Sequence, residues 1–346
     1  MEKDVDGHLV DLVAILHDHP KFLVSLNGYD FKIYEQRTGI RQGCPLSPYL
    51  FIIMMSIILQ DAREIRGSIV EKPYIVSPDI VYADDTMLLG SSASDVQKHL
   101  DAVVSVGRSY GLELNLGKTL LLRINGKSQI YGSDGNALKV CEEAVYLGGM
   151  ISCDGRSSAE ITRRLGEARS TFLNLVAIWK HANLTSARKK EVFDACVVSK
   201  LLYGLESNWV LQVERDKLDA FYAQCLRKIA GISHSYYSRV SNRTVLGKFG
   251  SLTLSKQLFA RQLLYFGHVA TLPEASLVRQ ATLQANLPQP RQWDIKRSVG
   301  RPRLRWTGCV YAMALDLAGG SSELGHLLDS PGQRAWKQAV KQYVST

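Results

Sequence analysis

The feature that most constrains the fold is the four-residue segment Tyr82-Ala83-Asp84-Asp85, which joins two short apolar runs. The runs, Ile80-Val81 and Met87-Leu88-Leu89, predict a strand, a tight turn and a returning strand. Because side chains alternate along a strand, one carboxylate is expected on each face of the turn. Such oxygen ligands hold Mg²⁺. Aspartate is also common in turns, so the pair alone leaves a structural interpretation open.

The residues before this segment predict further elements of mixed type. Residues 9–16 have helical spacing, and residues 22–26 and 31–34 are expected to pair around an Asn27-Gly28 turn. Ser47 as an N-cap, with Pro48 at the first helical position, predicts a helix to about residue 65. This helix is apolar nearly all round, which predicts that most of it is buried.

Three further helix signals follow along the chain. Ser94 and Gln97 form a capping box for a helix that stops near Gly111. Ser157 and Glu160 form a second capping box. The second half is helical throughout, with helices predicted over 186–206, 212–230 and 253–271. The fold class is therefore α+β, with a sheet-containing first part ending near residue 155 and a helical remainder.

Charge is distributed unevenly between these two parts. The chain has 346 residues and a formal net charge of +9. Residues 1–155 carry 14 basic and 20 acidic side chains, whereas residues 156–346 carry 28 basic and 13 acidic ones. A net of −6 joined to a net of +15 indicates an acidic module followed by one that binds a polyanion. Solvated basic helix faces are the alternative.

The cysteine pattern and the hydropathy of the chain indicate in which part of the cell the protein is expected. The six cysteines are scattered without any Cys-x-x-Cys pair, which argues against a zinc knuckle or a disulfide framework. The acidic start of the chain lacks the apolar core of a secretory signal. The longest apolar run, residues 49–59, is shorter than the roughly 20 residues that span a bilayer. We expect an intracellular protein of the nucleus or cytoplasm, neither secreted nor membrane-bound.

The segment upstream of the Asp pair carries a family resemblance. It reads Thr38-Gly39-Ile40-Arg41-Gln42-Gly43-Cys44-Pro45-Leu46-Ser47-Pro48. With Tyr82-Ala83-Asp84-Asp85 behind it, the sequence resembles reverse transcriptases of non-LTR (LINE-like) retrotransposons. In that family, a Gly-x-x-Gln-Gly-x-x-Leu-Ser-Pro segment begins the palm helix and Tyr-Ala-Asp-Asp follows.

Later segments extend the resemblance over nearly the whole chain. Residues 111–119 look like the next palm motif, and Tyr146-Leu147-Gly148-Gly149-Met150-Ile151 resembles the primer-grip hairpin. Residues 201–206 and 300–306 resemble the thumb and the C-terminal portion of these elements. The resemblance implies a partial right-hand polymerase palm, an antiparallel sheet packed on helices, and then an all-helical thumb and C-terminal region. The corresponding domains are 1–155 (partial fingers and palm), 156–232 (thumb-like) and 233–346 (basic and helical).

The resemblance also assigns roles around the hairpin. Asp84 and Asp85 are expected to be the catalytic metal ligands of a two-Mg²⁺ centre. Lys118 is expected to protonate the departing pyrophosphate or to neutralise its charge. Tyr82 and Ala83 are expected to lie against the nucleotide and the primer end. The reaction implied is RNA-directed DNA synthesis.

Nucleic-acid contacts are expected in two places. Gln42 and Gly43 would let the backbone approach the template base and the incoming nucleotide closely, and Arg41 would contact template or phosphate. In the basic stretch 291–306, the contacts to an RNA template and a DNA primer are expected from three arginines, which are Arg301, Arg303 and Arg305. The flanking Trp293 and Trp306 offer planes for base stacking.

One family motif has no counterpart in the sequence. The family's first palm motif supplies another metal-binding Asp upstream of the Gln-Gly segment. Asp4 and Asp6 are the nearby acidic residues, and no apolar strand precedes them. We therefore expect an N-terminally truncated reverse transcriptase with weak or no polymerase activity. A catalytically inactive remnant that only binds RNA or DNA is the alternative, and a maturase-like protein is disfavoured by the residue 300–306 tail. The oligomeric state stays open.

Overall fold

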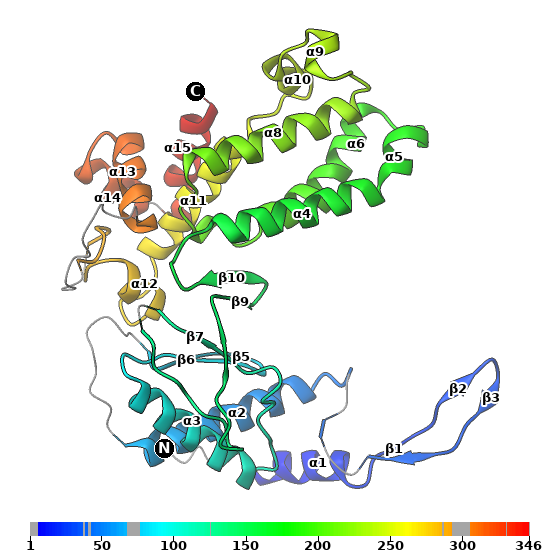
Figure 1. The fold of residues 1–346 in the computed structure, drawn as a ribbon, viewed down its shortest axis with the longest axis vertical. Coiled ribbons are helices and arrows are strands. Elements are labelled where there is room, and N and C mark those ends of the chain that lie inside the picture. Colours follow the sequence, from blue (N-terminus) through cyan, green and yellow to red (C-terminus); the bar gives the residue numbers. More distant parts are fainter. Residues whose placement is uncertain are drawn as a thin grey trace.

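The computed structural model describes residues 6–36, 39–40, 43–67, 77–124, 126–285, 287–292, 305–329 and 331–345. Two parts follow one another along the chain (Figure 1). The first, up to about residue 155, combines helices with short strands, and the second is helical. The hairpin of residues 143–152 lies between them (Figure 1). This arrangement confirms the predicted α+β class with a helical second half.

The first part holds three helices and ten short strands among its described residues. The helices are α1 (Gly7–His17), α2 (Ser47–Arg66) and α3 (Ala93–Ser109). The strands are β1 (Lys21–Phe22), β2 (Ser25–Leu26), β3 (Tyr29–Asp30), β4 (Tyr34–Glu35), β5 (Asp79–Tyr82), β6 (Asp85–Leu88), β7 (Leu120–Leu122), β8 (Lys139–Cys141), β9 (Glu143–Tyr146) and β10 (Gly149–Ser152). They form two-stranded sheets, antiparallel for β1–β4, β2–β3, β5–β6 and β9–β10. The small antiparallel sheets agree with the predicted fold class, and β7–β8 is the one parallel pair among the described strands.

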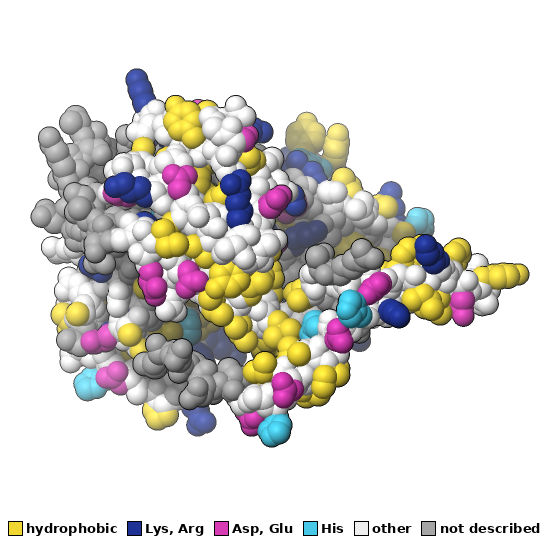
Figure 2. Space-filling view, turned by 90° about the horizontal axis from the view of Figure 1, so that it is seen from below, with side chains coloured by type: hydrophobic (Ala, Val, Ile, Leu, Met, Phe, Trp, Pro, Cys, Tyr) yellow, Lys and Arg dark blue, Asp and Glu magenta, His cyan; other side chains and the backbone are white. Residues whose placement is uncertain are grey.

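The predicted hairpin near the N-terminus forms an arm that projects from the rest of the structure (Figure 1). Asn27 and Gly28 both take left-handed φ values, 53° and 80°, as a two-residue type I′ turn requires. The arm's apolar side chains, including Phe22, Leu26 and Tyr29, are exposed. Figure 2 shows hydrophobic side chains along the projecting arm and on the face beside it.

Helix α2 is buried on one face only, so the expectation that most of it is buried is wrong. Its Ile58 and Ala62 pack against Ala102 and Val106 of α3, and the small residues let the two helices approach closely. The opposite face of α2 is open among the described residues, where Ile53 is 56% exposed. The apolar sequence allows any face of α2 to be buried, but only the face that packs against a neighbouring element is buried in the structure.

Both capping boxes and one N-cap predicted from the sequence differ in the structure. α3 begins earlier, at an N-cap formed by Ser92, whose side chain accepts a hydrogen bond from the Asp95 amide. Ser47 lies inside α2, which has Leu46 as its N-cap residue. The Ser157 side chain makes no capping bond and instead donates to the Trp209 carbonyl, while Glu160 bonds to groups described below. At Ser157 and Glu160, tertiary partners outcompete the local cap.

The second part is built from helices. These are α4 (Ser158–Asn174), α5 (Val176–His181), α6 (Ser186–Phe193), the π-helical η1 (Asp194–Val198), α7 (Ser199–Leu202), the 3₁₀ turn η2 (Leu205–Ser207), α8 (Gln212–Ile229), α9 (Ser235–Ser238), α10 (Asn242–Lys248), α11 (Leu254–Ala270), α12 (Leu277–Thr282), α13 (Trp306–Ala318), α14 (Ser321–Leu328), the 3₁₀ turn η3 (Pro331–Gln333) and α15 (Arg334–Ser345). Among the described residues, no helix has the length and apolar content needed to cross a membrane.

Two buried clusters hold these helices together. One joins α4, α6, α8 and the start of α11, with Phe172, Phe193 and Tyr222 in ring contact. The other joins the end of α11 to α13, α14 and α15 around Phe266 and Trp336. Helix α11 contributes to both clusters, so it connects the two packed groups. The division at residues 232 and 233 stays a prediction.

Candidate active site

The four-residue segment forms the tip of an antiparallel hairpin made of β5 and β6. Tyr82 pairs with Asp85, which leaves Ala83 and Asp84 as the two turn residues. Ala83 has a φ of 52°, a conformation that costs a residue with a Cβ about 1–2 kcal/mol. Tyr82 is 65% exposed, and both carboxylates are exposed. The structure thus brings Tyr82, Ala83, Asp84 and Asp85 together on one open, strained turn.

The two carboxylates are the type of ligand that a hard cation prefers, but they are too few to make up its full ligand set. Mg²⁺ prefers six oxygen ligands and commonly keeps waters beside one or two carboxylates. Asp84 and Asp85 supply such oxygens on adjacent residues. Within the ranges that the structure describes, no group of three or more His, Cys, Asp or Glu side chains is placed to hold a metal ion. The turn therefore offers a partial ligand set.

A buried ionic cluster fixes the base of this hairpin. Asp79, the first residue of β5, is buried and accepts two hydrogen bonds from the Arg63 guanidinium of α2, one of them 3.0 Å from Nε to Oδ2. The imidazole of His99, from α3, is also buried and lies with Nε2 3.4 Å from Asp79 Oδ2. The bidentate pair therefore ties β5 to α2, three residues before Tyr82.

The protonation of His99 follows from its neighbours. Arg66 donates from Nη1 to His99 Nδ1 at 2.9 Å, and arginine has no acceptor, so the ring proton lies on Nε2. Burial lowers the pKa of His99, and the positive charges of Arg66 and Arg63 lower it further against the opposing effect of Asp79. A neutral imidazole is thus favoured between the two arginines.

A second hairpin, β9–β10, contacts the first through one side chain. The Tyr146 hydroxyl donates to the Ile80 carbonyl at 3.1 Å and lies 3.5 Å from the Asp85 carbonyl. Burial and then the charge of Asp85 raise the pKa of Tyr146, so its hydroxyl stays protonated and acts as a donor. Tyr146, the last residue of β9, therefore joins that strand to both β5 and β6.

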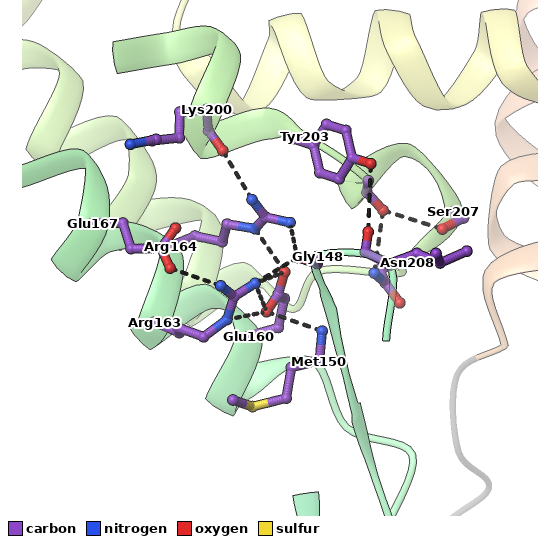
Figure 3. A network of polar contacts seen from close by, with 12 residues as sticks. Gly148, Met150, Glu160, Arg163, Arg164, Glu167, Lys200, Tyr203, Ser207 and Asn208 are labelled. Carbon is purple, nitrogen blue, oxygen red and sulfur yellow. Dashed lines mark hydrogen bonds and ion pairs between the residues drawn. The ribbon is translucent and has the colours of Figure 1, made fainter. Parts of the chain in front are cut away.

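The turn of β9–β10 is held by helix α4 (Figure 3). Leu147 and Gly148 have φ values of 49° and 76°, again a type I′ turn, and the Gly148 carbonyl accepts from Arg163 Nη2 at 2.8 Å and Arg164 Nη2 at 2.5 Å. Glu160 accepts from both arginines and, at 3.2 Å, from the Met150 amide. One buried carboxylate thus orders two guanidinium groups around one turn.

The remaining predicted site residues make no described bond to this turn or lie outside the described residues. Gly43 has a φ of 89° and lies exposed shortly before α2. Lys118 is exposed in the turn before β7, with its amide bonded to Asn115. Arg305 is exposed at the start of α13. Arg41, Gln42, Arg301 and Arg303 lie outside the described residues, as do Asp4 and Trp293.

Two expectations about side chains need correction. Trp306 is not an open stacking plane, because its ring packs 5.5 Å from that of Tyr265 and its Nε1 donates to the Glu206 carbonyl at 2.7 Å. Asp6 caps helix α1 by accepting from the His8 amide at 2.9 Å, which accounts for it structurally.

Sequence reasoning missed the residues that support the hairpins. Asp79 and His99 come from different elements, and no local pattern pairs them. Glu160, Arg163 and Arg164 do carry a signal, because the spacings of three and four residues place them on one helix face. The sequence predicts a capping-box role for Glu160 instead.

Comparison with known proteins finds a family match over the part of the chain that contains the β5–β6 turn. The family described as reverse transcriptase (RNA-dependent DNA polymerase) matches residues 9–151. An uncharacterized transposon-derived protein of Caenorhabditis elegans is 28% identical over 239 residues, which are 65% of this chain and 81% of the relative.

Two polyproteins are also similar. The Pol polyprotein of a type-1 retrotransposable element R2 from Popillia japonica is 26% identical over 57% of this chain. The Pol polyprotein of element R2DM from Drosophila melanogaster is 27% identical over 42% of this chain. The matched parts span 33% and 15% of these two polyproteins. Residues 9–151 thus match the reverse transcriptase family, and the chain is similar to proteins of R2 retrotransposable elements and to a transposon-derived protein.

Proposed function

We propose that the chain is an RNA-directed DNA polymerase of a retrotransposon, with its catalytic centre at the β5–β6 turn. The observation that carries this proposal is the turn itself. Two adjacent, solvent-open carboxylates lie on a strained hairpin tip inside the segment that matches the reverse transcriptase family. Strain of this kind is typical of functional sites.

In the proposed site, Asp84 and Asp85 hold Mg²⁺. Bound divalent ions supply charge neutralisation of the attacking and leaving oxygens during nucleotidyl transfer. Tyr82 lies against the incoming nucleotide and the primer end, and Ala83 keeps that approach free of a bulky side chain. Lys118 serves the departing pyrophosphate, and Gly43, with Arg41 and Gln42, serves the template.

The proposed partners are an RNA template and a DNA primer. Residues 156–346 carry a net charge of +15, which suits a polyanion. Within them we assign phosphate contacts to Arg301, Arg303 and Arg305. The helical region after residue 155 is proposed to be a thumb that follows the duplex, in domains of 156–232 and 233–346.

We further propose that a polypeptide of these 346 residues polymerises weakly. Its described residues bring two carboxylates, not three, to one place. An incomplete charge-stabilising centre commonly loses on the order of 10²-fold in rate. The same observation favours the second candidate, a protein that binds nucleic acid without synthesis.

Primer extension on an RNA template with Mg²⁺ separates the two candidates. The polymerase proposal predicts template-dependent incorporation about 10²-fold or more below a retroviral enzyme, lost in Asp84→Ala and kept in Asp101→Ala. Asp101 is an exposed carboxylate of α3 and serves as the matched control. Incorporation that survives Asp84→Ala contradicts the assignment of the centre. Duplex binding with no incorporation supports the binding protein.

A further inference from the structure

An exposed pair of tyrosines lies at one end of the helical part. Tyr236 and Tyr237, both in α9, are 67% and 78% exposed, and the second value is the highest among the exposed large apolar side chains of the described residues. Their ring centroids are 5.3 Å apart, and the ring planes meet at 87°. Figure 1 shows α9 and α10 at the end of the helical part that lies away from the β5–β6 hairpin. The pair is therefore separate from the candidate active site.

The segment that carries the two tyrosines is anchored on both sides of α9. Arg227 of α8 is buried, and its Nη1 donates to the Ser233 carbonyl, before α9, at 3.4 Å. After α9, the same guanidinium donates to the Val240 carbonyl and, from Nη2 at 3.0 Å, to Asn242 Oδ1. Val245 of α10 is fully buried in the core cluster beneath. The two rings are thus presented at a fixed place on the surface.

The sequence around the pair carries positive charge without any carboxylate. Residues 220–273 contain seven lysines and arginines and no Asp or Glu, whereas the whole chain has 33 acidic residues among 346. The described bonds of Arg227 all go to neutral groups, so they do not neutralise its charge. Arg239, Arg243 and Lys248 are exposed in the same stretch. The surface of α9 and α10 is therefore expected to attract anions.

Arg239 lies directly beside the tyrosines. Its φ is 55°, a conformation that a residue with a Cβ adopts uncommonly. Its guanidinium lies 5.4 Å from the ring centre of Tyr236, so a cation covers one face of that ring. The combination of an arginine with open aromatic rings suits a nucleic-acid strand, because the guanidinium pairs with phosphate and the rings stack on bases.

The arrangement of the rings favours an unpaired strand over a duplex. The bases of a duplex are stacked on one another, whereas unpaired bases can be splayed apart and stacked on aromatic side chains. Two rings that meet at 87° cannot both lie parallel to one continuous stack of bases. The surface therefore fits a strand whose neighbouring bases turn apart.

We propose that Tyr236, Tyr237, Arg239 and Arg243 form a binding site for an unpaired nucleic-acid strand. Bases stack on the tyrosine rings, and phosphates pair with the two arginines. Unpaired RNA and unpaired DNA offer the same two groups, so both are compared in the test. The inference goes beyond the proposed function, because binding at this surface requires neither Asp84 nor Mg²⁺.

Photocross-linking locates such a strand on the protein directly. The 346-residue protein is mixed in EDTA with iodouracil-labelled oligonucleotides of roughly 12 nucleotides, a length within the site sizes of single-strand-binding modules. The three probes are single-stranded RNA, single-stranded DNA and a blunt RNA duplex. Cross-links to Tyr236 or Tyr237, mapped by mass spectrometry, are expected with at least one single strand and not with the duplex. The single strand that cross-links more strongly identifies the source of the ligand.

Fluorescence anisotropy with that strand measures the contribution of stacking. Tyr237→Ala is expected to weaken binding about fivefold or more, the usual cost of one lost stacking contact. Tyr29→Ala, at a position 76% exposed on the N-terminal arm, is the matched control and is expected to keep wild-type affinity. Asp84→Asn is also expected to keep it, which separates this site from the proposed metal centre.

The salt dependence of binding measures the contribution of the arginines. Arg239→Gln with Arg243→Gln should reduce the slope of log K against log salt by roughly 1.4, as two lost phosphate contacts to a single strand do. Lys98→Gln with Arg108→Gln removes two exposed charges of α3 and should leave the slope unchanged.

The outcomes are read together. Cross-links at the tyrosine pair with the single strand alone, joined to the loss of affinity in Tyr237→Ala, support the proposal when circular dichroism and melting temperature stay near wild type. The absence of cross-links at either tyrosine with all three probes overturns it and favours a protein as the occupant. Equal cross-linking of the duplex overturns it, as does equal affinity in Tyr237→Ala and Tyr29→Ala.

Discussion

Ala83 and Leu147 hold left-handed φ values, 52° and 49°, at the tips of two hairpins that Tyr146 joins. Both residues carry a Cβ, so each turn stores about 1–2 kcal/mol of backbone strain. Alanine and leucine themselves do not predict this conformation, since glycine or asparagine is the usual choice. At Leu147 the following Gly148 is a type I′ signal that the sequence does carry.

At the scale of single residues, the sequence predicts neighbours but not distant partners. Asp84 and Asp85 are adjacent in the chain, so they lie together at the turn that the sequence predicts. The partnership of Asp79 with Arg63 and His99 joins residues from three elements. Its members have no shared spacing, and only tertiary packing makes the cluster visible.

The His99 cluster predicts a pH-dependent stability. Burial and the charges of Arg66 and Arg63 lower the pKa of His99 below its ordinary 6.5. The unfolded state therefore takes up the proton first as the pH falls. The contribution of His99 is complete above pH 6.5 and is lost progressively as the pH falls toward the folded-state pKa.

Thermal unfolding between about pH 7.5 and pH 5 measures this effect. His99→Gln is expected to lower the melting temperature at neutral pH but to flatten its fall toward acid. His326→Gln, at an exposed position on α14, is the control and should keep the wild-type slope. Equal slopes for the wild type and His99→Gln would show that the imidazole is not the titrating group.

At the scale of elements, periodicity predicted the long helices well. The ranges 212–230 and 253–271 correspond to α8 (Gln212–Ile229) and α11 (Leu254–Ala270), and the range 186–206 holds α6, η1 and α7 in succession. The π-helical turn of η1 is invisible to a 3.6-residue period. The helix caps were less predictable. The predicted capping box of Ser157 and Glu160 does not form, because both side chains have tertiary partners that a local motif cannot reveal.

The packing of α11 against α15 depends on a missing side chain. A Cβ on Gly267 would collide with the indole of Trp336, which is fully buried and donates to the Leu263 carbonyl at 3.1 Å. Gly267→Ala is therefore expected to lower the free energy of unfolding by about 1–3 kcal/mol, as overpacking does.

Chemical denaturation checks this prediction against a matched glycine. Gly166, inside α4, has open space where a Cβ would lie, so Gly166→Ala should raise the free energy of unfolding by about 0.5–1 kcal/mol. If both alanine variants are stabilised alike, the contact between α11 and α15 is looser than the structure indicates.

At the scale of the whole molecule, the charge asymmetry follows the division in architecture. The sheet-containing part carries the carboxylates of the candidate site, and the helical part carries the excess of positive charge. The sequence predicted this division because charge and periodicity change near the same residue. It could not predict that the β9–β10 hairpin bonds mainly to the helical side.

The basic tail predicts a salt-dependent affinity for nucleic acid. Replacing Arg301, Arg303 and Arg305 with glutamine should weaken binding to single-stranded RNA and reduce the slope of log K against log salt by roughly 2. The control removes three exposed lysines of the acidic part, which are Lys32, Lys98 and Lys139. A control slope reduced as much as that of the arginine variant would mean that the tail has no special role.

The central claim is that the Asp84–Asp85 turn holds the catalytic cation of a reverse transcriptase, and Mn²⁺ binding followed by electron paramagnetic resonance tests it most directly. The 346-residue protein is titrated with Mn²⁺ in the presence of an RNA template, a primer without a 3′-hydroxyl and the matching nucleotide. Asp84→Asn with Asp85→Asn should weaken Mn²⁺ binding by about tenfold or more. Asp11→Asn with Asp101→Asn, at exposed positions of α1 and α3, should leave it unchanged. Equal Mn²⁺ affinity in the wild type and the Asp84–Asp85 variant would contradict the account.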